Sequence, residues 1–157
     1  MTVKTSEDPR VQIEPLQQDA EAKLDAVRSL LSACELPTAD LASFFGTQFL
    51  AVEDEDDLIA VVGLEGYQDV ALLRSLAVTS GHRGHGIGRA LVKKAEQQAI
   101  DAGVRDLYLL TMTAQDFFAE LGYTVADRAS APASIKGTTQ FSGLCPDAAV
   151  LMHKRLA

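Results

Sequence analysis

The residues best suited to chemistry lie in a glycine-rich turn, RGHGIG, at positions 83–88. Gly84, Gly86 and Gly88 lack side chains, so backbone N–H groups of this turn can approach a ligand closely. A helical pattern begins directly after the turn, and the N–H groups and positive dipole at a helix start attract anions. Cationic side chains surround the same point, namely Arg83, Arg89, Lys93 and Lys94. The turn therefore predicts a phosphate or pyrophosphate site.

Two regular elements must position this turn. The segment VALLRSLAV, residues 70–78, is short and apolar and precedes a glycine-containing turn, which predicts a strand. From Ile87 to Ala99, apolar residues recur every four positions, which predicts a helix ending near Gly103. A Walker loop would need Lys-Ser or Lys-Thr after its last glycine, and the dinucleotide fingerprint would need glycine where Arg89 stands. Neither of these two phosphate-binding motifs fits.

Composition limits the classes of partner. The net charge of −8 argues against nucleic acid or an anionic membrane, because both favour a basic surface. No apolar run approaches the ~20 residues of a membrane span. The two cysteines form no CxxC pair, which predicts a reducing, cytoplasmic environment, and His and Cys lack the spacing of metal ligands.

The order of elements predicts a mixed α/β fold in one domain, residues 1–157, with a frayed, flexible start over residues 1–10. Residues 127–147 show no clear periodicity and predict either a substrate-covering loop or a structural excursion. The predicted strands are 11–16, 48–54, 58–66, 70–78, 105–111, 123–126 and 148–156. The predicted helices are 19–34, 38–45, 89–103 and 113–122.

The pattern R-x-x-G-x-G after a strand ending in LAV, together with DFFAELGY, resembles the acetyl-CoA-binding signature of the GNAT N-acetyltransferase superfamily. The resemblance covers about residues 49–156. It implies the GNAT fold, a mixed central sheet of about six to seven strands flanked by about four helices. It also implies acetyl-CoA as co-substrate, with the pantetheine arm on the strand end, the pyrophosphate on the turn and an aromatic side chain beside the thioester. The implied contacts are Leu76, Ala77, Val78, Arg83, Gly84, His85, Gly86, Ile87, Gly88, Arg89, Phe117 and Phe118.

More narrowly, LLRSLAV, LLTMTAQDFFAELGY and TTQFSGLCP resemble a GNAT subgroup found with arsenic-resistance genes, and more distantly the catalytic domain of glutamate N-acetyltransferases. This implies a small-molecule amine acceptor, either an amino-acid-like toxin such as arsinothricin or phosphinothricin, or glutamate. Family members commonly pair as homodimers. Phe118 stands where many members have a proton-donating Tyr, and Leu72 where many have a basic Glu. The first departure leaves open a non-catalytic acyl-CoA sensor.

Acetylation of an amine needs a proton acceptor, and Glu65 is the candidate base; an exposed strand-end charge is the alternative. Arg74 lies in an apolar strand, where a guanidinium needs a partner. It predicts a fork for a substrate carboxylate or an internal pair with Glu65 or another acid. Ser75 should point to the opposite face. Further acceptor contacts are predicted at Ser75, Lys136, Thr139 and Phe141, while Cys145 and His153 are predicted to be structural.

Overall fold

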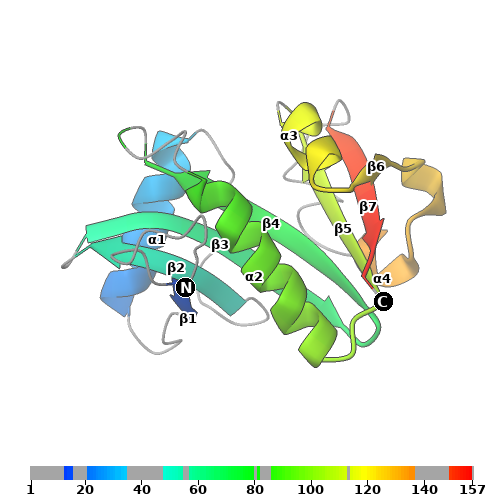
Figure 1. Cartoon of the computed structure of the whole chain (residues 1–157), viewed down its shortest axis with the longest axis horizontal. Coiled ribbons are helices and arrows are strands. Elements are labelled where there is room, and N and C mark those ends of the chain that lie inside the picture. The colour runs from blue at the N-terminus through cyan, green and yellow to red at the C-terminus, as the bar shows by residue number, and fades with distance from the viewer. Residues whose placement is uncertain are drawn as a thin grey trace, which may run out of the picture. The chain divides into compact units, whose positions relative to one another are not determined.

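The computed structural model describes residues 13–15, 21–34, 48–54, 57–79, 81, 86–112, 114–136 and 149–156 (Figure 1). The strands pair in the order β1-β2-β3-β4-β5-β7-β6, with parallel and antiparallel neighbours. This confirms the mixed α/β fold with a seven-stranded sheet. The elements are β1 (Ile13–Pro15), α1 (Glu21–Ala33), β2 (Gln48–Asp54), β3 (Asp57–Tyr67), β4 (Val70–Val78), α2 (Ile87–Asp101), β5 (Asp106–Thr111), α3 (Gln115–Glu120), β6 (Thr124–Val125), a 3₁₀ turn (Arg128–Ser130), α4 (Ala133–Lys136) and β7 (Val150–Arg155).

The chain forms two compact units. The first comprises Met1–Gly63 and Ser75–Ala95, and the second comprises Leu64–Arg74 and Glu96–Ala157. The chain therefore passes from one unit to the other inside β3, inside β4 and inside α2. The assignment of the whole chain to one domain stays a prediction. Within the described ranges, none of the helices combines the length and apolar character needed to cross a membrane.

The first unit is built on α1 and the strands that it covers. The apolar stripe of α1 is buried against β2, β3 and the end of β4, as its three- and four-residue spacing predicts. β1 pairs antiparallel with β2, from Ile13 opposite Val52 to Pro15 opposite Leu50. Since Ala77 belongs to this core, the end of β4 is held in place by apolar packing. The core residues are Leu24, Val27, Leu30, Leu31, Phe49, Ala51, Val61 and Ala77.

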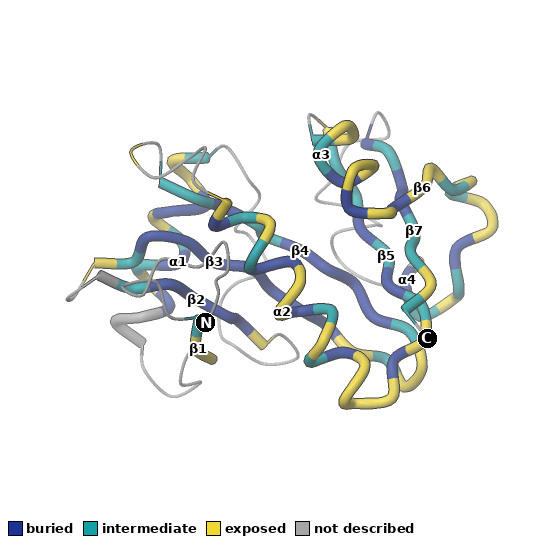
Figure 2. The backbone as a smooth tube through the Cα atoms, in the orientation of Figure 1, coloured by how far each residue is buried: buried dark blue, intermediate teal, exposed yellow. Residues whose placement is uncertain are grey.

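The second unit is built on β5. β5 pairs in parallel with β4, from Val70 opposite Asp106 to Leu72 opposite Tyr108, and antiparallel with β7 along its full length. β6 pairs with β7. Leu72, Ala131, Ile135 and Leu151 form an apolar cluster, so α4 and the turn before it pack on this part of the sheet. Figure 2 shows the middles of β3 and β4 as buried, which matches their nearly continuous apolar sequences.

Most predicted elements differ from the structure by one or two residues at their ends, and two differences bear on the site. α2 begins at Ile87 rather than residue 89, because the Ala90 N–H already donates to the Gly86 carbonyl at 3.0 Å. Residues 127–136 contain a 3₁₀ turn and α4, with Ile135 fully buried, so this half of the predicted 127–147 loop is folded. Its role as a substrate-covering loop or a structural excursion stays a prediction. A four-residue helix is too short to show a period in the sequence. The predicted helix 38–45, the start 1–10 and positions 137–148 lie outside the described residues.

Candidate active site

The start of α2, in the first unit, is where the sequence predicts an anion site. Gly86 has a φ of +79°, a left-handed conformation that glycine adopts easily and other residues rarely do. A Cβ added at this exposed glycine would meet only open space, so the backbone here is accessible. Ile87, 7% exposed, anchors the first turn in the core, while Gly88 is half-buried. The backbone at the start of α2 is thus partly exposed, at Gly86 and Gly88.

The charges around this helix start favour an anion. The first turn of α2 contains no acidic residue, and Arg89, Lys93 and Lys94 are exposed. A helix of 15 residues has a developed dipole, with its positive end at these amides. The described residues therefore fit a diphosphate. Arg83, Gly84 and His85, which the sequence adds to this site, lie outside the described residues.

The last residues of β4 lead toward this turn. Leu76 and Val78 are half-buried, whereas Ala77 is 3% exposed and packs under α1. The Cys34 thiol donates a weak hydrogen bond to the Val78 carbonyl, with Sγ 3.8 Å from the oxygen. The Thr79 N–H donates to the Ile59 carbonyl at 2.9 Å. These contacts fix the path of the backbone that the sequence assigns to the pantetheine arm.

Ser75 lies inside β4 and has a left-handed φ of +59°. A residue other than glycine in this region costs about 1–3 kcal/mol and persists only where the surrounding structure imposes it. A left-handed residue also breaks the regular alternation of side chains along a strand. The prediction that Ser75 and Arg74 point to opposite faces assumed that alternation. The sequence held no signal for this break, because serine is compatible with an ordinary strand.

In the second unit, Glu65, Arg74 and Tyr67 form a polar trio, in which Glu65 and Arg74 are buried and Tyr67 is half-buried. The Arg74 Nη1 lies 2.6 Å from Glu65 Oε2, and the Tyr67 hydroxyl donates to Glu65 Oε1 at 2.7 Å. The side chains of Arg74 and Glu65 are 2% and 11% exposed. Glu65 is therefore not an exposed strand-end charge. Of the two interpretations of Arg74, the internal pair with Glu65 is the one that the structure contains, and it compensates the buried guanidinium.

Tyr67 is a polar residue that sequence reasoning missed. Burial raises its pKa strongly, the hydrogen bond to the Glu65 carboxylate and its charge raise it further, and Arg74 opposes this weakly. Tyr67 therefore remains a neutral phenol over the whole physiological pH range. The available signal was its spacing: Tyr67 follows Glu65 by two positions, so a strand places both side chains on one face.

The two phenylalanines predicted beside the thioester differ in burial. Phe118 is 6% exposed and meets Phe117 and Tyr123 edge-to-face, at centroid distances of 5.0 and 5.6 Å. Phe118 is thus part of the core of the second unit, and half-buried Phe117 is the more accessible ring. Lys136, predicted to contact the acceptor, donates to the Ala129 carbonyl at 2.7 Å. Thr139, Phe141 and Cys145 lie outside the described residues.

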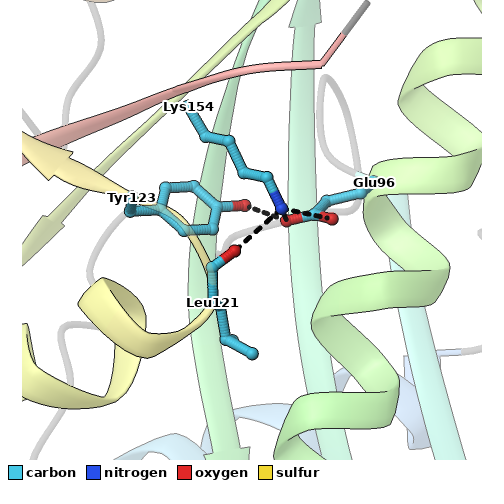
Figure 3. A network of polar contacts seen from close by, with 4 residues as sticks. All are labelled: Glu96, Leu121, Tyr123 and Lys154. Atoms are coloured by element: carbon cyan, nitrogen blue, oxygen red, sulfur yellow. Dashed lines mark hydrogen bonds and ion pairs between the residues drawn. The ribbon is translucent and has the colours of Figure 1, made fainter.

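A second polar cluster holds α2 to the turn after α3 and to β7 (Figure 3). The Tyr123 hydroxyl donates to Glu96 Oε2 at 2.7 Å. Lys154 Nζ lies 3.1 Å from both Glu96 oxygens, 2.8 Å from the Leu121 carbonyl and 5.5 Å from the Tyr123 ring centre. Burial and the Glu96 carboxylate raise the pKa of Tyr123 strongly. Each polar atom of this cluster has a protein partner, which indicates a structural role.

The pattern of the Acetyltransferase (GNAT) family matches residues 17–123. The chain belongs to this family. Over 66 residues it is 39% identical to an uncharacterized N-acetyltransferase of Chlorobaculum tepidum, and this match covers 42% of each chain. The GNAT chain thus matches less than half the length of that relative.

Solved structures share the GNAT fold. N-acetylglutamate synthase of Neisseria gonorrhoeae, complexed with coenzyme A and N-acetyl-glutamate, has a TM-score of 0.77 at 18% identity, over 93% of this chain and 35% of its own. A Mycobacterium tuberculosis protein in complex with CoA and NLQ has a TM-score of 0.73 at 20% identity, over 93% of this chain and 99% of its own.

Two positions at which many GNAT proteins have a proton-transferring residue are apolar in this chain. Phe118, which stands where many members have Tyr, is a buried ring without an exchangeable proton. Leu72, which stands where many have Glu, is 1% exposed inside an apolar cluster. In this GNAT chain, Glu65 and Tyr67 are joined by a hydrogen bond and lie on the strand adjacent to β4.

Proposed function

We propose that this GNAT chain transfers the acetyl group of acetyl-CoA to the primary amine of a small amino acid or amino-acid-like toxin. The observation that carries the proposal is the start of α2. There, a left-handed Gly86, a first turn without acidic residues and exposed cations form a cradle for a diphosphate. The names of two solved relatives, which include coenzyme A, support the same ligand.

Coenzyme binding is assigned to the chain from Leu76 to Arg89. The backbone of Leu76, Ala77 and Val78 would hold the pantetheine arm, and the first amides of α2 with Arg89 would hold the diphosphate. Arg83, Gly84 and His85 lie in the same stretch of sequence and complete the predicted set. When bound, the coenzyme supplies an acetyl thioester whose thiolate is the leaving group. Phe117, the more accessible of the two rings, is the better candidate to pack beside it.

Glu65 is assigned as the group that takes the proton. An aliphatic amine is mostly protonated at neutral pH and attacks only after losing a proton. Arg74 holds one oxygen of the Glu65 carboxylate, so that the carboxylate has a fixed orientation in a buried setting. Along β4, Arg74 is followed directly by Ser75 and by the residues assigned to the coenzyme. In the sequence, Arg74, the partner of the base, therefore shortly precedes the residues that are assigned to the coenzyme.

The acceptor class follows from the sequence resemblance and from one structural relative. The resemblance to arsenic-associated GNAT proteins supports arsinothricin or phosphinothricin, and the relative with N-acetyl-glutamate supports glutamate as the alternative. The Arg74 side chain is 2% exposed and one of its nitrogens is paired with Glu65, so a substrate carboxylate would have to reach a buried guanidinium. This favours carboxylate contacts elsewhere, with Lys136 and Thr139 as the predicted polar residues and Phe141 as a predicted apolar contact.

The test is release of the CoA thiol with a panel of arsinothricin, phosphinothricin, L-glutamate and L-aspartate. Release with one of them is expected, and Glu65→Gln should lower kcat/KM by about 10²-fold at neutral pH. Asp69→Asn, which removes an exposed carboxylate from the same hairpin, is the matched control and should leave it unchanged. Heat of CoA binding without thiol release from any acceptor would instead establish the acyl-CoA sensor.

The homodimer and the cytoplasmic location stay predictions. Light scattering across a range of protein concentrations measures the molar mass in solution. A mass of twice the monomer at all concentrations would support the homodimer, and a monomer mass would exclude it.

A further inference from the structure

We propose that Tyr67 carries the proton from the acceptor's ammonium group to Glu65. The inference rests on the proposed acetyl transfer and adds a catalytic residue to it. Its starting point is the hydrogen bond in which the Tyr67 hydroxyl donates to Glu65 Oε1 at 2.7 Å. Neither Phe118 nor Leu72 can exchange a proton, whereas Glu65 and Tyr67 can.

The three residues of the trio differ in their exposure to solvent. The Arg74 side chain is 2% exposed, the Glu65 side chain is 11% exposed, and Tyr67 is half-buried. Tyr67 is therefore the most exposed residue of the trio, and Arg74 has the most buried side chain. In the proposed step, the ammonium group approaches the trio from the side of Tyr67. Arg74, whose side chain is buried, acts as a positioning residue for Glu65.

The hydrogen-bond roles leave Tyr67 able to accept an ammonium proton. Its O–H group is directed at Glu65 Oε1, so the lone pairs of its oxygen are available to an N–H donor. Glu65 Oε2 is engaged by Arg74 at 2.6 Å. Oε1 is thus the carboxylate oxygen that receives a proton along the existing hydrogen bond, and no rearrangement of the trio is needed.

The proton balance of the step closes within these groups. An N–H bond of the ammonium breaks as an O–H bond forms on Tyr67 Oη. The original Tyr67 O–H bond breaks as an O–H bond forms on Glu65 Oε1. The amine becomes neutral and nucleophilic, Glu65 becomes a neutral acid, and Tyr67 is again a phenol. The raised pKa of Tyr67 is consistent with this role, because a relay must be neutral before and after the transfer.

Packing is the competing explanation for Tyr67. Its ring also lies against the apolar cluster of Leu72 and Ile135, so a change at Tyr67 could act through the fold alone. Tyr108 provides a matched control, because it packs against the same cluster and its pKa is raised by burial and then by Asp106, not by Glu65. Replacing either tyrosine by phenylalanine removes one hydroxyl and keeps the ring.

The first measurement is the pH dependence of kcat/KM for the better acceptor of L-glutamate and phosphinothricin. Tyr67→Phe should lower kcat/KM by about 10²-fold near neutral pH, and the deficit should shrink as the pH rises through the amine's own pKa, where no proton needs removal. Tyr108→Phe should follow the wild type throughout. Because the two groups act in series, adding Tyr67→Phe to Glu65→Gln should cause little further loss.

The outcomes separate the relay from the proposed function. A deficit of Tyr67→Phe that is equal at all pH values, an additive double variant, or no deficit would overturn the relay while acetyl transfer stands. A wild type that acetylates no acceptor would overturn both. A second readout needs no turnover: Glu65→Gln should make tyrosine ionise at lower pH in an absorbance titration of the native protein, and Tyr67→Phe should abolish that difference. Titration curves that coincide for wild type and Glu65→Gln would also overturn the relay.

Discussion

Breaking the buried pair of Arg74 and Glu65 should destabilise the fold far more than breaking an exposed pair of the same geometry. The perturbations are Arg74→Met, which removes the guanidinium and keeps much of the side-chain volume, and Glu65→Gln, which removes the carboxylate charge. Each leaves the opposite charge without its principal partner. The pair has an Nη1–Oε2 distance of 2.6 Å and side-chain exposures of 2% and 11%, so water can replace very little of the lost interaction.

The magnitude follows from the desolvation of the remaining charge. Removing one partner of a buried ion pair costs about 3–5 kcal/mol of unfolding free energy. Near this chain length each kcal/mol lowers Tm by about 2–4 °C, which gives a fall of roughly 6–20 °C for either single variant. The double variant buries neither charge. It should therefore recover part of the loss, with a coupling free energy of at least about 2 kcal/mol.

The assay is urea unfolding of the four proteins in one double-mutant cycle, with the thermal midpoint as a second measure. Arg28 and Asp25 on α1 are the matched control. Their Nη1–Oδ1 distance is 2.7 Å, but their side chains are 36% and 74% exposed. Arg28→Met should therefore change the unfolding free energy by about 0–1 kcal/mol. Equal effects of Arg74→Met and Arg28→Met, or a coupling energy near zero, would refute the reasoning.

Three further predictions concern the helix start, α4 and the tyrosines. Gly86→Ala forces a left-handed φ on alanine, which costs about 1–2 kcal/mol. This variant should bind CoA about tenfold more weakly in a calorimetric titration. The control Gly81→Ala involves no left-handed φ and should bind CoA like the wild type. Ile135→Ala should lower the unfolding free energy by about 2–5 kcal/mol in urea, while half-buried Ser134→Ala should change it little, and equal effects would contradict the packing of α4. The fold raises the pKa of all three tyrosines above the ordinary value of 10.0. The neutral tyrosines therefore contribute fully to the unfolding free energy below that pH, and this contribution is lost as the pH rises above it. Tyrosinate absorbance of the native protein should then appear only well above pH 10.0, and its appearance near pH 10.0 in a folded protein would show that the pKa values are not raised.

Much of the fold could be predicted from local patterns. The predicted strands 48–54 and 70–78 coincide with β2 and β4, because each is an apolar run bounded by a turn. The buried face of α1 follows from its helical spacing. Gly86 could be singled out because a glycine directly before a helical pattern permits the left-handed turn that the structure contains. α4 could not be predicted, because four residues are too few to show a helical period in the sequence.

For the candidate site too, local sequence patterns predicted some features and not others. The sequence by itself determined which residues are able to do chemistry, because residue types and short spacings are local properties: a glycine turn before a helix, an acid near a strand end, an arginine among apolar neighbours. Only the tertiary structure decided that Arg74 is paired with Glu65, that Tyr67 completes the trio and that Ser75 has a left-handed φ inside β4. Those facts depend on how neighbouring strands align and on which side chains lose contact with water. Strand alignment and burial arise from contacts between distant parts of the chain, and no single stretch of sequence encodes them.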